Sequence, residues 1–163
     1  MASKVYLTAI RVINCQSMAD VTINFLPEKL NVFVADNSTG KSIFYKLLMV
    51  TACPKKFNRE DRNNLIRRGS PFAQIIYQFS DGSYGAVRIY PERIIYYFTE
   101  SAKQKMSQSL SPDQRLLERL SLIIDGKSEF VANIIDMDQN LLFVDSNTKS
   151  NSNILTMLTT DET

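Results

Sequence analysis

Histidine is absent from this chain of 163 residues. Without imidazole groups, the chain cannot contain a Ser-His-Asp triad, a Cys-His nucleophile or a histidine-containing zinc site. The two cysteines, Cys15 and Cys53, are isolated and form no C-x-x-C pair. Neither a disulfide framework nor a paired-thiolate metal site is therefore expected. Any chemistry must use carboxylates, lysine, hydroxyl groups, the backbone or a bound metal.

Long apolar runs are also missing. No run approaches the roughly 20 residues that span a bilayer, and the N-terminus lacks the apolar core of a signal peptide, so we expect a cytoplasmic protein without membrane contact. The 44% apolar content is typical of a single globular domain. The net charge of +2 is too small to indicate nucleic-acid binding by itself, and charge clusters must be considered instead.

The N-terminal part of the chain predicts strands followed by a helix. Apolar and polar residues alternate in residues 5–9 and 21–25, which is typical of strands. A third apolar run, residues 30–34, predicts another strand that leads directly into a loop containing glycine and lysine. Apolar residues then recur at helical spacing, so we predict a helix over residues 40–52 that ends before Pro54.

Two hairpins are predicted further along the chain. Residues 72–79 and 84–90 alternate around a Ser-Asp-Gly-Ser turn, and residues 94–98 predict one more antiparallel strand. Residues 130–135 and 141–144 predict a second hairpin.

A short helix is predicted between these hairpins, with Ser111 as its N-cap, Pro112 at its first position and Gly126 after its end. Together these elements predict an α/β fold with a mixed sheet that is antiparallel in its N-terminal part, one helix after the loop, and additional β-hairpins. We expect the domain to occupy residues 1–146. Residues 147–163 are rich in Ser, Asn and Thr and predict a poorly ordered tail or the start of a connection.

The loop between the third predicted strand and the helix resembles a P-loop, or Walker A motif. Such a loop turns its backbone N–H groups around a phosphate while the following helix points its positive end at it. In this motif glycine lets the backbone approach, lysine reaches the β- and γ-phosphates, and the last hydroxyl binds Mg²⁺. The matching residues are Asp36, Asn37, Ser38, Thr39, Gly40, Lys41 and Ser42. Ala35 stands where the first glycine of the motif belongs, so a nucleotide-free interaction module is one alternative.

The segment before the loop carries a second signature. Residues 10–25 resemble the opening of the SMC-like and RecF-like ATPases, which are ABC-type P-loop proteins. The residues that fit the family's pattern are Asn14, Ser17, Asp20, Ile23 and Phe25, and residues 65–69 fit its next segment. Cys15 replaces an aromatic residue of the pattern and Gln16 a basic one. The resemblance covers residues 4–98, implies ATP and Mg²⁺ as ligands, and places Gln16 and Ser17 beside the nucleotide.

The resemblance also identifies what the chain lacks. No Leu-Ser-Gly-Gly signature occurs, and the Walker B aspartate and catalytic glutamate of these ATPases belong to a C-terminal lobe. Two stretches imitate a Walker B strand, one ending at Asp145 and one at Asp161-Glu162. The main hypothesis is an incomplete ATPase: the N-terminal lobe of a head that acts in DNA repair, maintenance or defence. For hydrolysis it would need a C-terminal lobe and a second head. Either the chain is a fragment of a longer protein with a coiled coil after about residue 145, or its complement is a separate polypeptide. The rival is a self-contained small P-loop NTPase or kinase with Asp145 as its Walker B residue.

One stretch of the sequence is strongly basic. Its cations are Lys55, Lys56, Arg59, Arg62, Arg67 and Arg68. Glu60 and Asp61 interrupt it, so it predicts either a solvated surface or a contact with DNA phosphates. The family resemblance favours DNA.

Overall fold

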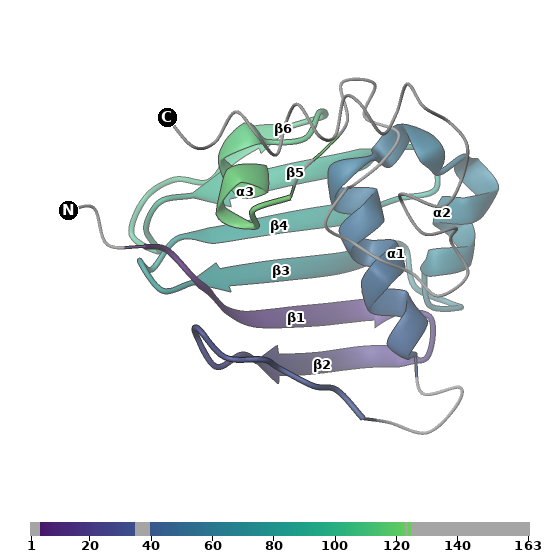
Figure 1. The fold of residues 1–163 in the computed structure, drawn as a ribbon. Coiled ribbons are helices and arrows are strands. Elements are labelled where there is room, and N and C mark those ends of the chain that lie inside the picture. The colour runs from purple at the N-terminus through teal and green to yellow at the C-terminus, as the bar shows by residue number, and fades with distance from the viewer. Residues whose placement is uncertain (1–3, 35–39, 123, 125–163) are drawn as a thin grey trace, which may run out of the picture.

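A computed structural model of the chain describes residues 4–34, 40–122 and 124. Its centre is a six-stranded sheet in the order β2-β1-β3-β4-β5-β6, and every neighbouring pair is antiparallel (Figure 1). The strands are β1 (Leu7–Cys15), β2 (Met18–Asn24), β3 (Ala73–Phe79), β4 (Tyr84–Ile89), β5 (Ile94–Thr99) and β6 (Ser107–Ser109). Because β3 pairs with β1, strand β2 forms one edge of this sheet.

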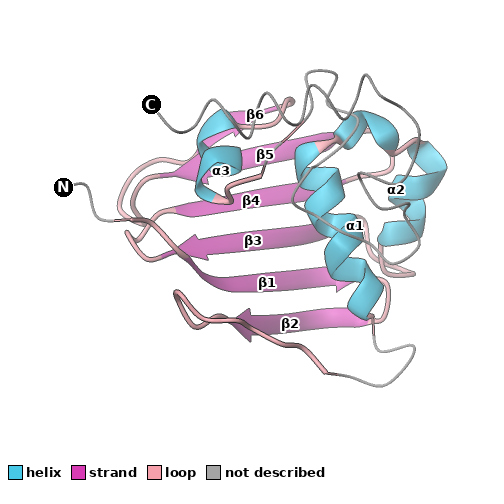
Figure 2. Ribbon diagram, in the orientation of Figure 1, coloured by secondary structure: helices cyan, strands magenta, loops and turns pink. Residues whose placement is uncertain are grey.

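The helices between and after these strands are short. They are α1 (Lys41–Ala52), the 3₁₀-helix η1 (Pro54–Lys56), α2 (Arg59–Leu65) and α3 (Gln114–Arg119). Figure 2 shows α1 and α3 lying across the same face of the sheet, with α2 beyond the strand ends. None of the described helices is long and apolar enough to cross a membrane.

Helix α1 is fixed to the sheet by apolar packing and by buried hydrogen bonds. Leu47 and Val50 are fully buried in the same cluster as Val12 and Ile75 of the sheet. The hydroxyl groups of Thr51 and Tyr77 lie 2.7 Å apart, and Tyr96 Oη donates to the Val50 carbonyl oxygen at 3.1 Å. These contacts satisfy the polar ends of two buried rings, which would otherwise be costly to bury.

Several sequence predictions are confirmed. The helix predicted over residues 40–52 is α1, and the hairpin predicted around residues 80–83 is β3–β4. The additional antiparallel strand is β5, which pairs with β4.

The prediction of a mixed sheet is wrong for the described part of the chain, where the sheet is wholly antiparallel. The predicted strand over residues 30–34 is also wrong, since these residues pair with no described strand and are largely exposed. An apolar run becomes a strand only where a neighbouring strand supplies hydrogen-bond partners. None of the described strands supplies such partners to residues 30–34.

The helix predicted after Ser111 is shorter than expected. Its N-cap is Asp113, whose carboxylate accepts from the Arg115 backbone N–H at 3.0 Å, so the cap lies two residues later. The helix ends at Arg119, because Ser121 adopts a left-handed backbone with φ of 53°. Gly126, the hairpin predicted over residues 130–144 and the tail 147–163 lie outside the described residues. Helix α2 and strand β6 were not predicted.

Gly85 allows α3 to pack closely on β4. A Cβ atom at Gly85 would lie 2.3 Å from Leu116 Cδ1, closer than packed carbon atoms approach. We predict that Gly85→Ala lowers the free energy of unfolding by about 1–3 kcal/mol, because overpacking forces the helix away from the sheet. Urea unfolding measures this. In a Leu116→Ala background, which removes the colliding side chain, the same change should cost much less. An equal cost in both backgrounds would show that Gly85 acts through the backbone alone.

The buried core should lose stability in alkali. Burial raises the pKa of the Cys15 thiol from 9.0 to about 12 and raises the pKa of the Tyr77 and Tyr96 phenols above 10.0. The unfolded chain therefore releases these protons at lower pH than the folded chain, so the stability is complete below pH 9.0 and is lost as pH rises. Urea midpoints below pH 9.0 and above pH 10.0 test this, and Tyr96→Phe should reduce the dependence. Unchanged midpoints would contradict it.

Candidate functional site

Gly40 stands at the junction between the predicted P-loop and α1. It is the N-cap of the helix and has φ of 96°, a conformation that favours glycine. A Cβ atom there would lie 2.8 Å from Met18 Cε and 2.9 Å from Ile43 Cδ1. The backbone at Gly40 is therefore pressed against the turn between β1 and β2, where Ser17 Oγ would be 3.5 Å from the same Cβ.

That turn is joined to the segment after α2. The Gln16 N–H donates to the Leu65 carbonyl oxygen at 3.0 Å, and the Arg67 N–H donates to the Asn14 carbonyl oxygen at 2.8 Å. Cys15 and Ile66 form a β-bridge between them. Asn14 and Gln16 both have positive φ, 52° and 47°, a strain that these long-range bonds compensate.

The Arg67 side chain reinforces this junction. Its Nη1 donates to the carbonyl oxygens of Ser17, at 2.8 Å, and Gln16, at 3.4 Å. Sequence reasoning placed Arg67 in a basic stretch and missed this contact, because neither spacing nor composition relates residue 67 to residue 17. The Gln16 amide donates to the Asn64 carbonyl oxygen at 3.2 Å. Ser17 thus lies beside Gly40, in the turn that also contains Gln16, and a direct contact of either with a nucleotide stays a prediction.

The start of α1 suits an anion. The first turn contains no acidic side chain, so the positive end of the helix is not neutralised there. Ser42 is exposed in that turn, next to Lys41, the first residue of the helix. These described parts fit a phosphate group. Asp36, Asn37, Ser38 and Thr39 lie outside the described residues, so their roles stay predictions.

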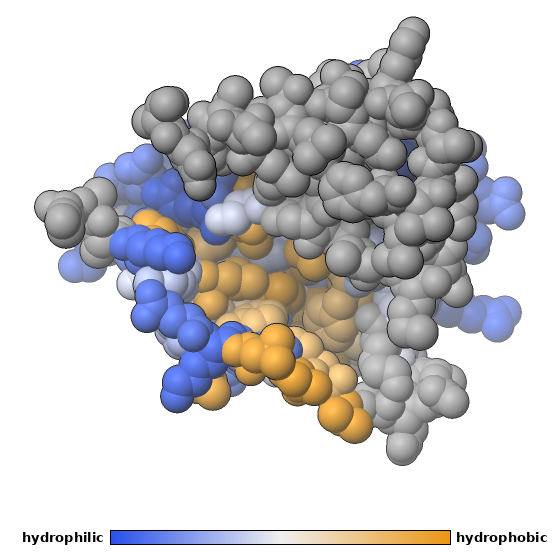
Figure 3. Space-filling view, in the orientation of Figure 1, coloured by the Kyte–Doolittle hydropathy of each residue, from blue (hydrophilic) through white to orange (hydrophobic). Residues whose placement is uncertain are grey.

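The segment that leads into the loop exposes a row of large apolar side chains. Their exposed fractions are Leu26 62%, Leu30 90%, Val32 71%, Phe33 51% and Val34 90%. The Asn31 side chain holds the preceding turn, because it accepts from the Leu26 N–H and donates to the Leu26 and Lys29 carbonyl oxygens. Figure 3 shows apolar atoms gathered at this edge of the molecule, beyond β2. We call residues 26–34 the apolar edge. Its exposed apolar side chains are carried by a segment whose turn is held by the Asn31 hydrogen bonds.

The cations of the basic stretch fall into two groups in the structure, those that contact other residues of the protein and those that are exposed. Arg59 pairs with Glu92 at 2.6 Å, and Arg62 donates to the carbonyl oxygens of Pro91 and Phe57. Since Arg67 is also engaged, the exposed cations that make no such contact with the described residues are Lys55, Lys56 and Arg68. Three of the six predicted cations therefore have structural roles.

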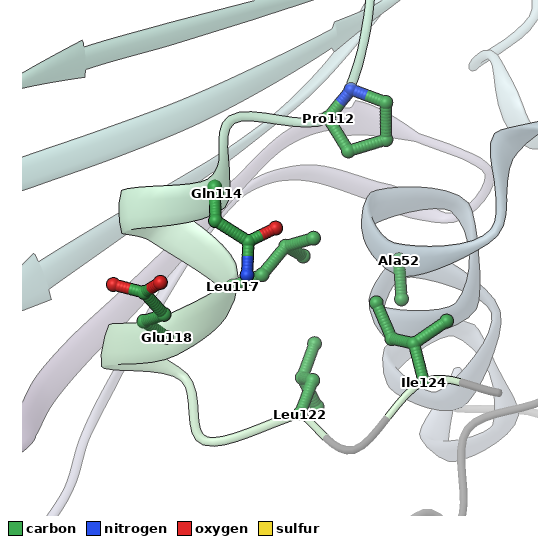
Figure 4. A pocket seen from close by; sticks show the side chains of 7 residues that line it. All are labelled: Ala52, Pro112, Gln114, Leu117, Glu118, Leu122 and Ile124. Atoms are coloured by element: carbon green, nitrogen blue, oxygen red, sulfur yellow. The ribbon is translucent and has the colours of Figure 1, made fainter. Parts of the chain in front are cut away.

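A pocket of about 390 Å³ lies at the other end of α1 (Figure 4). Among the described residues it is lined by Ala52, Pro112, Gln114, Leu117, Glu118, Leu122 and Ile124. Ala52 is the last residue of α1, roughly 16 Å along the helix from Lys41. The pocket is therefore separate from the loop that is predicted to hold phosphates.

The described part of the chain contains no cluster of side chains that could hold a metal ion by itself. Within residues 4–34, 40–122 and 124, no group of three or more Cys, Asp or Glu side chains could hold a metal ion. The predicted Walker B candidates Asp145, Asp161 and Glu162 lie outside these residues.

The fold is similar to that of a chain solved in work on the ATP-driven dimerization and DNA-stimulated activation of SMC ATPases. The likeness is one of fold alone. The TM-score is 0.54 with 18% sequence identity, and the match covers 78% of this chain and 85% of that one, so the two chains have similar lengths. No protein-family model and no curated protein matches the sequence. The SMC-like fold thus rests on tertiary structure.

The Arg67 contact generates a prediction for nucleotide binding. Arg67→Ala removes the donors that hold the Ser17 carbonyl oxygen, and with it the turn that packs against Gly40, so the loop should be less well positioned. We expect affinity for ATP·Mg²⁺ to fall roughly three- to tenfold, measured by titration calorimetry. Lys56→Ala, which removes an exposed cation elsewhere, is the control for charge. Equal losses in the two variants would show that Arg67 acts only as a positive charge.

Proposed function

We propose that the chain is the N-terminal lobe of an SMC-like ATPase head, which binds ATP·Mg²⁺ and hydrolyses ATP only when a C-terminal lobe and a second head complete the site. The observation that carries the proposal is the apolar edge that leads directly into the predicted P-loop. A continuous apolar run is typical of a strand buried on both faces, yet residues 30–34 are largely exposed. A second lobe would supply the missing cover and strand partners.

The residues at the loop have distinct tasks in this proposal. Gly40 allows close approach of backbone N–H groups, Lys41 neutralises the β- and γ-phosphates, and the Ser42 hydroxyl ligates Mg²⁺. The metal ion supplies charge neutralisation on the phosphates when it is bound. The junction of the β1–β2 turn with residues 64–67 holds Gly40 in position. A group that orients the attacking water is still required, and in this proposal the C-terminal lobe supplies it.

A role in DNA repair, maintenance or defence is part of the proposal. It is supported by the sequence resemblance and by the similarity to a chain studied for DNA-stimulated activation. Lys55, Lys56 and Arg68 are the exposed cations of the basic stretch that are available for phosphate contacts.

The central test separates binding from turnover. The chain should bind ATP in the presence of Mg²⁺ without steady release of phosphate, because the groups that position water and stabilise the γ-phosphoryl charge are incomplete. Lys41→Ala should weaken binding roughly 10- to 100-fold, because a charged hydrogen-bond donor to the phosphates is lost. Calorimetry measures the affinity, and a phosphate-release assay measures turnover.

Three other results would contradict the proposal. Undiminished affinity in Lys41→Ala would exclude the P-loop assignment. Steady hydrolysis that is lost in Asp145→Asn would establish a small self-contained NTPase or kinase. Absence of any nucleotide binding would favour an interaction module.

A further inference from the structure

The two faces of the sheet have different chemistry. On β4, Val87 and Ile89 are fully buried in the cluster that includes α1, so Arg88 between them projects from the opposite face. No described helix covers that face, because α1 and α3 both lie on the other side (Figure 2). Arg88 is directly paired with Gln74 of β3 and Ile95 of β5, and both follow the same alternation.

Two arginines and three aromatic rings form a continuous row on this open face. The Arg88 guanidinium carbon lies 4.6 Å from the ring centre of Phe72 and 5.4 Å from that of Tyr97. The rings of Phe72 and Tyr90 are 5.6 Å apart, and the Arg93 guanidinium carbon lies 5.5 Å from the ring centre of Tyr90. We call these five residues the arginine–aromatic row. All three rings are half-buried, so part of each ring remains accessible.

The row carries uncompensated positive charge. In the described part of the chain neither Arg88 nor Arg93 forms an ion pair, and the nearby Glu92 is paired with Arg59. Arg88 donates from Nε and Nη2 to the neutral Gln74 Oε1 at 3.2 and 3.1 Å, which leaves its Nη1 donors unused by the described residues. The other charges described on this face, Arg11 and Asp20, neutralise each other. The charge of the row therefore favours an anionic ligand.

We propose that the arginine–aromatic row binds single-stranded nucleic acid, with bases stacked on the rings and guanidinium planes and phosphates paired with Arg88 and Arg93. Accessible rings next to arginines are the features with which stacking platforms hold unpaired bases, and such stacking tolerates any base sequence. An acidic peptide would satisfy the charges but offers no aromatic bases to stack on the rings. The site is separate from the predicted phosphate loop and from the basic stretch, and it does not depend on nucleotide binding.

Fluorescence anisotropy with a labelled oligothymidylate tests the proposal on the full chain. Tyr97→Leu, which keeps an apolar side chain but removes the ring, should weaken binding roughly 5- to 100-fold, whereas Tyr97→Phe should bind normally. Arg88→Lys keeps the charge but loses the planar group, and should also weaken binding. Affinity should fall as salt is raised. Circular dichroism and urea unfolding establish that each variant is folded.

Two control variants test whether the oligothymidylate binds at the arginine–aromatic row. Arg115 lies over the Phe98 ring at 4.5 Å, but on the helix-covered face, so Arg115→Ala should bind the probe normally. The double variant Lys55→Ala/Lys56→Ala removes two cations that are proposed to contact DNA phosphates, and it should weaken binding less than Tyr97→Leu does. The proposal is overturned if the native chain does not bind the probe, if Tyr97→Leu binds like the native chain, or if only the double lysine variant loses binding. Equal displacement of the probe by polyglutamate would also overturn it, because that polymer has charge but no bases.

Discussion

The packing of α1 on the antiparallel sheet is the constraint on which the other features depend. Leu47 and Val50 enter the apolar core, and the Thr51 and Tyr96 hydroxyl groups fix the same helix through buried hydrogen bonds. Because an α-helix is rigid over three turns, anchoring its C-terminal half determines where Gly40 and the first turn lie. The candidate phosphate site is thus positioned by contacts made at the opposite end of the helix.

The β1–β2 turn adds a second constraint at the N-terminal end of α1. It contacts Gly40 through Met18 and is held by the backbone bonds of residues 64–67 and by Arg67. A displacement of residues 64–67 would therefore be transmitted through packed atoms to the loop.

The sheet has two chemically different faces because strand side chains alternate, and the segment beyond the β2 edge forms a third surface. One face forms the core beneath α1 and α3, and the other carries Arg88 with its aromatic neighbours. Beyond the β2 edge lie exposed apolar residues such as Leu30 and Val34. An apolar surface of this kind favours another protein surface, whereas the arginine–aromatic row favours an anionic, stacking ligand. The proposed lobe partner and the proposed nucleic acid therefore would not compete for the same place.

The sequence by itself determined those elements that have a clear local pattern. The spacing of apolar residues after Gly40 predicts α1, and the alternation around Gly82 predicts the β3–β4 hairpin, because both patterns reflect short-range geometry. The glycine, lysine and serine of the loop likewise predict a phosphate site from adjacent residues. Only the tertiary structure decided that residues 30–34 lack a strand partner, that Arg67 supports the Ser17 turn, and that Phe72 meets Arg88. Each of these three features depends on how segments far apart in the sequence meet in space. The periodicity of neighbouring residues carries no information about such contacts.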